Sequence, residues 1–402
     1  MFAPRAAVAF VLVTVIVDMI ALGMMVATLP ILIIGLTGGD PPTAARIYGV
    51  IGTCWALMQF IGSPIMGALS DRFGRRPILL LSSLGRAIDY AAMALAPSVG
   101  WLFMGRMLSG FTSATIPSAG AYIADVAPPE KRAAAFGLIG ASFGIGFSVG
   151  PALGGFLSSF DPRLPFWFCA AISLANVVYG YFVLPESLAV EKRAAFSWAR
   201  ANPLGSLKLL RSHPELFGLA CVAFLHFLAH GVLPNVMVIY VNFRFGWTSE
   251  AIGYLMAVSG LAAVLVQGGL VRPLVKRFGE RTMLMFGLGC GAIGFAIYGS
   301  AAIPPVLFCG IPFVALWGLA SASSQGLLTR HVGPQEQGRL QGALACVRSI
   351  TDLIGPFLFT LTFANFAAAD APLVMPGAAH YVSSLLLVGG AVLAWRVTRA
   401  PT

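Results

Sequence analysis

Eight ionisable side chains stand inside long apolar runs of this chain. A charged group placed in a bilayer is costly, so ionisable residues kept there are candidates for function. A carboxylate beside an arginine, in a site that meets water and apolar surroundings in turn, can take up and release a proton. The eight residues are Asp18, Arg86, Asp89, Arg106, His226, His230, Arg348 and Asp352.

The spacing of these residues suggests how their charges are balanced. Arg86 and Asp89 are three residues apart, and Arg348 and Asp352 are four apart, so each couple shares a helix face. Such a couple can be purely structural, because its charges neutralise one another. Asp18 has no charged neighbour on its own helix. It must face a cavity, find a partner on another helix, or stay protonated.

Most of these residues lie at mid-depth, where transporter sites are expected. Helix rise places five of them roughly 13–21 Å into a core about 30 Å thick, and places Arg106 in the outer third. We predict a proton-coupling role for four residues: Asp18, Asp89, Arg106 and Asp352. We predict substrate binding by Arg86, Arg348, His226 and His230, although a mid-helix histidine can also be a neutral polar group.

The composition indicates a helical membrane protein. Hydrophobic residues make up 58% of the chain and charged residues 10%, too few charges to cover a soluble surface. Apolar runs of this length cross a bilayer as helices rather than as barrel strands. The net charge of +10 is scattered over short loops, which argues against nucleic-acid binding.

Twelve transmembrane helices are expected, in an integral multi-pass protein of the bacterial inner membrane. Most Lys and Arg then fall in cytoplasmic segments, and the outer loops hold only Arg46, Arg163 and Arg244, which predicts that both termini are cytoplasmic. The spans are predicted at about 7–36, 46–69, 77–96, 101–124, 133–159, 165–185, 215–241, 251–275, 282–302, 305–329, 340–365 and 379–396.

An internal repeat divides these spans into two halves. A shift of 205 positions carries Arg72 onto Arg277, Gly74 onto Gly279, and the same register continues to Pro356. We predict two pseudo-symmetric six-helix bundles, 1–185 and 215–402, joined by a cytoplasmic linker at 186–214. Such a repeat is typical of transporters that rock one half against the other.

The sequence offers no case for an enzyme. It shows no nucleophile–base arrangement, phosphate loop or metal-ligand spacing, and its six cysteines lie in apolar runs without a CxxC pair. We therefore expect no metal and no cofactor, with a proton gradient as the driving force.

Three motifs resemble the major facilitator superfamily. The segment GALSDRFGRRP, from Gly67 to Pro77, is similar to its signature loop, and LFMGRMLSG around Arg106 is similar to a helix 4 motif linked to proton transfer. The resemblance implies a charged cytoplasmic gate formed by Asp71, Arg72, Gly74, Arg75 and Arg76. The segment GASFGIGFSVGPALGG resembles the helix 5 motif of drug/proton antiporters, with a packing face at Gly146, Gly150, Pro151, Gly154 and Gly155.

Nearly the whole chain resembles the tetracycline/proton antiporters. The resemblance implies that Asp18 and Asp89 match functional acidic positions, and that Gln59 and Gln267 lie near the substrate path. That family carries a His in helix 8 and an Asp in helix 9, where this chain has Ala263 and Gly291. Loss of the carboxylate removes a metal ligand, so a magnesium–tetracycline substrate is not expected.

These observations favour a proton-coupled exporter of a small amphipathic compound, drug-like or metabolite, working as a monomer by alternating access. Its partners would be that small molecule, protons and the lipid bilayer, with no nucleic acid. Two alternatives stay open. One is a metabolite uptake or facilitative carrier of the same fold, for which the extra arginines suggest an anionic or zwitterionic cargo. The other is a membrane scaffold or sensor without cargo.

Overall fold

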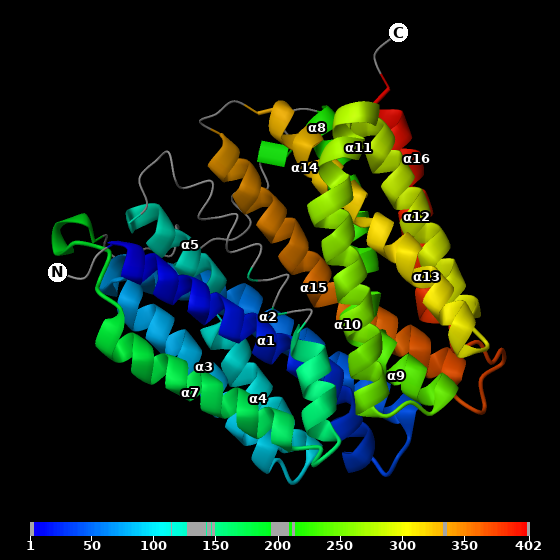
Figure 1. Cartoon of the computed structure of the whole chain (residues 1–402), viewed down its shortest axis with the longest axis horizontal. Coiled ribbons are helices and arrows are strands. Elements are labelled where there is room, and N and C mark those ends of the chain that lie inside the picture. Colours follow the sequence, from blue (N-terminus) through cyan, green and yellow to red (C-terminus); the bar gives the residue numbers. More distant parts are fainter. Residues whose placement is uncertain are drawn as a thin grey trace. The chain divides into compact units, whose positions relative to one another are not determined.

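The computed structural model is helical throughout its described part, in which no strand occurs (Figure 1). It divides into two compact units: unit 1 holds Met1–Gly39, Cys54–Asn202 and Thr248–Ala257, and unit 2 holds Asp40–Thr53, Pro203–Trp247 and Val258–Thr402. The described residues are 4–113, 115–126, 142, 146, 149–193, 209–210, 214–332 and 336–399.

Unit 1 is built from the N-terminal helices. It contains most of the first two helices, each of which is longer than the roughly 20 residues needed to cross a bilayer. Its helices are α1 (Pro4–Leu36), α2 (Pro41–Phe73), α3 (Arg75–Leu95), α4 (Val99–Thr112), α5 (Thr115–Val126), an unlabelled helix Val149–Ser158, α7 (Leu164–Val183) and η1 (Val190–Lys192).

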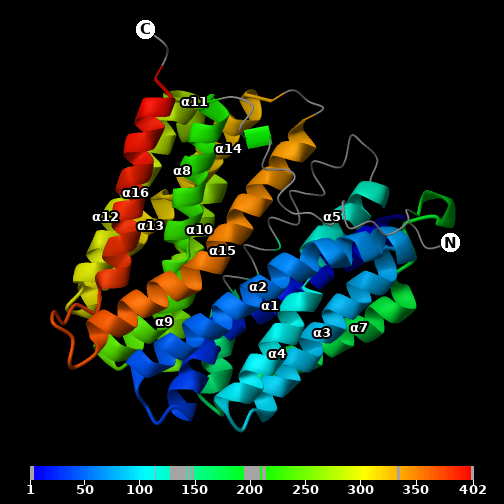
Figure 2. The same ribbon diagram turned by 180° about the vertical axis from the view of Figure 1, so that it is seen from behind.

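Unit 2 is built from the C-terminal helices. Within it, α12 and α16 lie side by side along much of their length in both views (Figures 1 and 2). Its helices are α8 (Pro214–His230), α9 (Val232–Phe245), the second part of α10 (Ser249–Leu265), η3 (Val266–Leu270), α11 (Val271–Phe278), α12 (Glu280–Ser300), α13 (Pro304–Leu316), α14 (Gly318–Arg330), α15 (Gln337–Ala367) and α16 (Ala378–Val397).

The described residues include ten helical spans that are long and apolar enough to cross a membrane. They correspond to the predicted spans except the fourth and fifth. The fourth is not one continuous helix, because α4 ends at Thr112 and α5 begins at Thr115. Much of the fifth, predicted at 133–159, lies outside the described residues, which include its end at Val149–Ser158. The orientation of the termini stays a prediction.

Some predicted spans are locally irregular. The π-helix η3 interrupts the eighth span, and α13 and α14 meet at Trp317 within the tenth. A membrane helix tolerates such points when neighbouring helices satisfy the freed backbone groups. The irregularity at Trp317 places an aromatic side chain in the middle of a span.

The repeat is visible in the backbone of two loops. Gly74 precedes α3 with φ 109° and ψ 162°, and Gly279 precedes α12 with φ 80° and ψ 158°. A side chain at positive φ is strained, so both turns need glycine. The two residues that the 205-residue shift aligns therefore share one uncommon conformation.

The glycine-rich fifth span packs closely against its neighbours in unit 1. A Cβ added at Gly150 would lie 2.9 Å from the Cα of Gly23, and one added at Gly154 would lie 3.0 Å from the Cα of Met24. A Cβ at Gly155 would lie 3.1 Å from the Cα of Gly253. Small residues thus let the helix Val149–Ser158 approach α1 on one side and the start of α10 on the other.

Candidate functional site

Asp18 finds its partner on another helix. The Nη2 atom of Arg86 on α3 lies 2.7 Å from Oδ2 of Asp18 on α1, and Arg86 also donates to the hydroxyl of Thr115, the first residue of α5. The Asp18 side chain is 3% exposed and that of Arg86 is 12% exposed. A buried charge needs such a partner. The guanidinium of Arg86 therefore links three helices of unit 1, namely α1, α3 and α5.

A second buried ion pair joins α3 to α4. Nη1 of Arg106 lies 2.9 Å from Oδ2 of Asp89, whose side chain is fully buried. Gly105 makes room for this carboxylate, since a Cβ there would lie 3.0 Å from its Oδ1. The guanidinium of Arg106 also lies 5.1 Å from the centre of the Trp55 ring, a cation–π distance.

These pairs differ from the one suggested by spacing. Arg86 and Asp89 share a face of α3, but the ion pairs of the described residues join Arg86 to Asp18 and Asp89 to Arg106. Spacing along one helix shows which groups share a face. It does not show which neighbouring helix presents the nearer charge.

Gln59, expected near the substrate path, donates to the Ser113 hydroxyl at 3.1 Å, where α4 ends.

In unit 2 the two histidines of α8 pack on one indole ring. The ring centre of Trp317 lies 4.6 Å from that of His226 and 5.8 Å from that of His230. His226 also lines a cavity of about 30 Å³ with Ser321, Ser324 and Gln325 of α14. The structure therefore brings these two predicted residues together around an aromatic side chain.

Arg348 and Asp352 are paired more loosely. Their closest charged atoms are 3.9 Å apart along α15, and both side chains are 49% exposed. The guanidinium of Arg348 lies 5.5 Å from the ring centre of Phe227, beside His226 in the sequence. This couple is the within-helix pair that the spacing predicted.

The two positions that depart from the tetracycline/proton antiporters have definite surroundings. Ala263 lies on α10, and Gly291 lies on α12. A Cβ added at Gly291 would lie 2.7 Å from carbons of the Trp317 indole and from Leu387. Trp317 thus occupies the space that a side chain at position 291 would need. Gln267 lies in η3, and its side chain is near Gly318 on α14.

The predicted gate residues centre on Arg75. Its guanidinium lies 2.5 Å from Oδ1 of Asp71 and 3.2 Å from Oδ2 of Asp125 at the end of α5. The backbone N–H groups of Arg75 and Arg76 donate to the two carboxylate oxygens of Glu186, at 2.8 and 3.2 Å. The loop before α3 is thereby tied to the ends of α5 and α7.

Arg72 and Arg76 are placed differently from Arg75. The guanidinium of Arg72 lies 5.1 Å from the ring centre of its neighbour Phe73. Arg76 donates to the backbone carbonyl of Tyr181 at the end of α7, and its guanidinium lies 5.6 Å from the ring centre of Tyr181. Among the predicted gate residues, Arg75 is thus the one whose side chain pairs with carboxylates in the described structure.

Unit 2 holds a counterpart of three members of this cluster, and their charges are reversed. The 205-residue shift carries Asp71, Arg75 and Asp125 onto three residues: Lys276, Glu280 and Arg330. Nη2 of Arg330 lies 3.0 Å from Oε1 of Glu280, so the pair between the start of one helix and the end of another is kept. The repeat preserves the pairing and not the sign of each charge.

Neighbouring contacts extend this second cluster. His331 lies 3.0 Å through Nε2 from the Glu215 carboxylate and 2.8 Å through Nδ1 from the Leu327 carbonyl. Arg281 donates to the Thr398 hydroxyl at 3.1 Å. The start of α12 and the ends of α14 and α16 are thus linked by polar contacts, and His331 adds the start of α8.

Sequence reasoning missed several residues at these sites. Glu186 was assigned to the linker. Its carboxylate meets the arginine-rich loop only because α7 packs against α3 in the folded chain, and the sequence does not show this contact. Trp55 and Trp317 carry no signal inside apolar runs. His380 is fully buried on α16, 4.7 Å from the Tyr240 ring centre, and the sequence signal was a histidine at the start of a predicted span.

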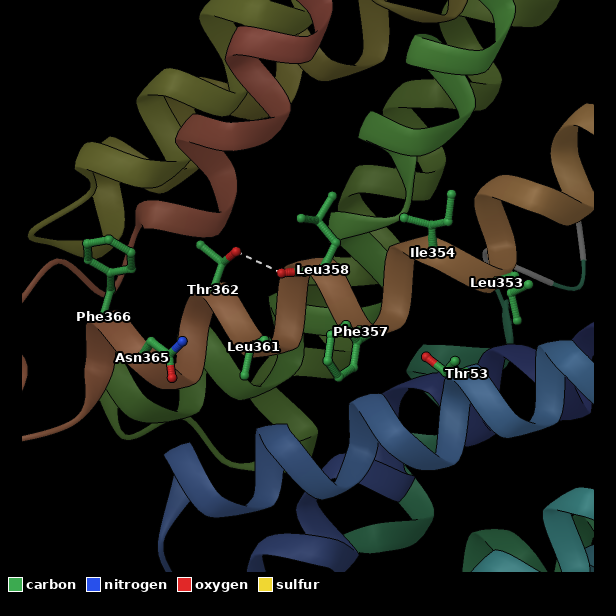
Figure 3. A pocket seen from close by; sticks show the side chains of 9 residues that line it. All are labelled: Thr53, Leu353, Ile354, Phe357, Leu358, Leu361, Thr362, Asn365 and Phe366. Atoms are coloured by element: carbon green, nitrogen blue, oxygen red, sulfur yellow. Dashed lines mark hydrogen bonds between the residues drawn. The ribbon is translucent and has the colours of Figure 1, made fainter.

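A larger cavity, of about 450 Å³, lies along α15 in unit 2 (Figure 3). Its polar groups are few: the Thr362 hydroxyl donates to its own helix, at the Leu358 carbonyl, and the Asn365 amide accepts from Arg46. Because it offers no carboxylate or histidine, we do not place proton chemistry there. It is lined by Thr53, Leu353, Ile354, Phe357, Leu358, Leu361, Thr362, Asn365 and Phe366.

Comparison with known proteins identifies the family. Residues 11–356 match the Major Facilitator Superfamily. The chain belongs to this superfamily. It is 37% identical over 373 residues to the class C tetracycline resistance protein of Escherichia coli, covering 92% of this chain and 93% of that protein. It is 34% identical to the class E protein of Escherichia coli, covering 88% and 86% of the two chains.

A solved structure supports the same fold. The human organic anion transporter MFSD10 (TETRAN) superposes with a TM-score of 0.70 at 23% identity, covering 98% of this chain and 100% of that one. The predicted resemblance and the predicted helical membrane fold are therefore confirmed. The protein is an integral, multi-pass member of a transporter superfamily.

Proposed function

We propose that this superfamily member is a proton-coupled exporter of small amphipathic compounds in the bacterial inner membrane, working by alternating access. The observation that carries the proposal is the fully buried Asp89 carboxylate, 2.9 Å from Arg106 within apolar spans of unit 1. A membrane protein that keeps such a group usually uses it, because burial is costly.

The proton would move through the carboxylates of unit 1. Protonation of Asp89 would remove its attraction for Arg106, and protonation of Asp18 would do the same for Arg86. Each event would loosen a contact between helices, since both pairs join two helices. Release of the proton on the other side would restore the contact. Proton binding would thereby bias one helix arrangement over another.

The class of cargo is proposed from the relatives of this chain, and the surroundings of Gly291 argue against one kind of cargo. The relatives named above are tetracycline resistance proteins, which supports export of a drug-like compound. In this chain Gly291 cannot ligate a metal, and Trp317 fills the space beside it. We therefore propose a cargo that does not arrive as a magnesium chelate. No cofactor is required, and one chain would contain the complete pathway.

Everted membrane vesicles with an acidic interior test this proposal. A panel of drugs, including tetracycline with magnesium, is added one at a time while a pH dye reports the gradient. At least one compound should dissipate the gradient in the wild type and not in Asp89→Asn. Asp161→Asn is the control, because Asp161 lies in an exposed loop next to Arg163. Uphill transport by Asp89→Asn at the wild-type level would contradict the proton role.

A metabolite carrier is the second candidate, favoured by the intramembrane arginines Arg86 and Arg348. Both could attract an anionic or zwitterionic cargo. This candidate predicts counterflow of a metabolite across vesicles without proton movement. Silence across the drug panel, with the protein present in the membrane, together with such counterflow would establish it in place of the exporter.

A further inference from the structure

A cavity of about 30 Å³ lies in unit 2 between α8, α14 and α15, and its polar lining is concentrated on two helices. His226 comes from α8, and Ser321, Ser324 and Gln325 come from α14. The rest of the lining is Ala223, Phe227, Leu328 and Leu344. One titratable ring and three neutral polar side chains thus share a small space with apolar walls.

The size of the cavity decides what it can hold. Pockets for drug-sized ligands measure roughly 300–1,000 Å³, so this cavity is too small for a cargo molecule. A water molecule needs about 10–15 Å³ of such space and two to four polar partners. The cavity has room for about one or two waters, and it offers enough hydroxyl, amide and imidazole groups to hold them.

One side chain of the lining needs a partner that no described residue supplies. Ser324 is 8% exposed, and its Oγ has no hydrogen-bond partner among the described residues. A buried hydroxyl left without a hydrogen-bond partner is unfavourable, because it has lost its contact with water. A metal ion does not fit, because no carboxylate or cysteine lines the cavity and His226 is its single metal-ligating side chain.

We propose that this cavity binds ordered water held by Ser324, Gln325 and His226, and that this water delivers protons to His226. The inference rests on the proton coupling proposed above and adds a second proton site, in unit 2. An incoming hydronium would give one proton to the unprotonated ring nitrogen of His226, leaving a neutral water in the cavity. One O–H bond breaks and one N–H bond forms, and the reverse step releases the proton.

The charges around His226 limit this site to one proton at a time. His230 lies one turn away on α8, and both rings pack on Trp317. The guanidinium of Arg348 lies 5.5 Å from the ring centre of Phe227, which lines the cavity, and Asp352 lies 3.9 Å from Arg348. Like charges repel, so a second proton on this pair would be strongly disfavoured.

The test follows exchange of the His226 ring proton with bulk water, and needs no cargo. Protein carrying ring-¹⁵N histidine is placed in nanodiscs, and His226→Gln assigns the His226 signal by NMR. Ser324→Val fills the cavity and should slow exchange about tenfold, the factor expected for one lost hydrogen bond in the path. Ser324→Ala, which leaves the space and removes one partner, should slow it less.

Ser323→Ala is the matched control. Ser323 is fully buried, and its Oγ also has no hydrogen-bond partner among the described residues, but it does not line the cavity. In Ser323→Ala the His226 ring proton should exchange at the wild-type rate. Equal exchange in Ser324→Val and Ser323→Ala, both monodisperse in detergent, would overturn the proposal. A high-resolution map showing no solvent oxygen in the wild-type cavity would also overturn it.

The proton dye assay in vesicles separates this inference from the proposed function. Slow exchange in Ser324→Val combined with no proton movement for any compound would support the water site and count against the exporter. Proton-coupled export that is identical in wild type and Ser324→Val, with equal exchange, would leave the exporter standing and reject the water path.

Discussion

Replacing Arg106 by glutamine should destabilise the protein far more than replacing Arg348 by glutamine. Both residues form an ion pair with an aspartate inside an apolar span. The two pairs differ in exposure and in distance, so the same chemical change probes two environments. The comparison therefore tests whether burial, and not the presence of a pair, decides the energy.

The magnitudes follow from the geometry. Arg106 is 6% exposed and its partner Asp89 is fully buried, at 2.9 Å. Removing one partner of a buried pair leaves an uncompensated charge, which costs about 3–5 kcal/mol. Arg348 and Asp352 are both 49% exposed and 3.9 Å apart. A pair this long and this open contributes less than a close, fully buried pair, so Arg348→Gln should lower the free energy of unfolding by less than Arg106→Gln does.

A double substitution separates the pair from its parts. Asp89→Asn and Arg106→Gln together remove both charges, and the two amides can still form a hydrogen bond. Replacing a buried pair by neutral groups is often close to neutral in stability. The double variant should therefore recover much of the stability lost in Arg106→Gln. This recovery is the signature of a direct interaction between the two side chains.

Unfolding in mixed detergent and SDS micelles, followed by circular dichroism, measures these differences. The free energies of unfolding are compared under one condition for wild type, the single variants Asp89→Asn, Arg106→Gln and Arg348→Gln, and the double variant. Similar losses for Arg106→Gln and Arg348→Gln would refute the reasoning from burial. A double variant as unstable as the sum of its singles would refute the direct pairing of Asp89 with Arg106.

Three further substitutions test other contacts. Gly74→Ala should lower stability by about 1–2 kcal/mol, because its φ of 109° strains a side chain, as thermal unfolding would show. Glu280→Arg should weaken the start of α12 by up to about 1 kcal/mol, and adding Arg330→Glu should restore it in the same assay. Gly291→Asp should cost about 1–3 kcal/mol through overpacking and fail to confer magnesium–tetracycline transport. Gly289→Ala is the control for both glycines, because open space lies beside it.

The helices could be predicted from sequence because long apolar runs leave a membrane chain few alternatives. Ten predicted spans correspond to helices of the described structure. The fourth span was predicted as continuous because hydropathy is averaged over about 19 residues, and the break between Thr112 and Thr115 is much shorter than that. A local change in backbone direction between two apolar stretches has no hydropathy signal, so periodicity alone cannot place it.

The charged residues could be chosen from sequence, but the partners that come from other helices could not. Asp18 stood out because it had no charged neighbour on its own helix, and the structure supplies Arg86 from α3. That pairing depends on how α1 packs on α3, which is a long-range property. Trp317 could not be chosen from the sequence at all. An indole in an apolar run resembles any other core residue, until its contacts with His226 and the space at Gly291 are known.

The reversed cluster of unit 2 shows what the repeat has retained. If the signature loop needed particular charges in both halves, Arg75 would be matched by another cation. Glu280 stands there instead, and its partner Arg330 has changed sign with it. A change at one position alone would have left two like charges facing one another. Glu280 and Arg330 join the start of α12 to the end of α14, as Arg75 and Asp125 join the start of α3 to the end of α5 in unit 1. The retained property is therefore the pairing of opposite charges at this contact.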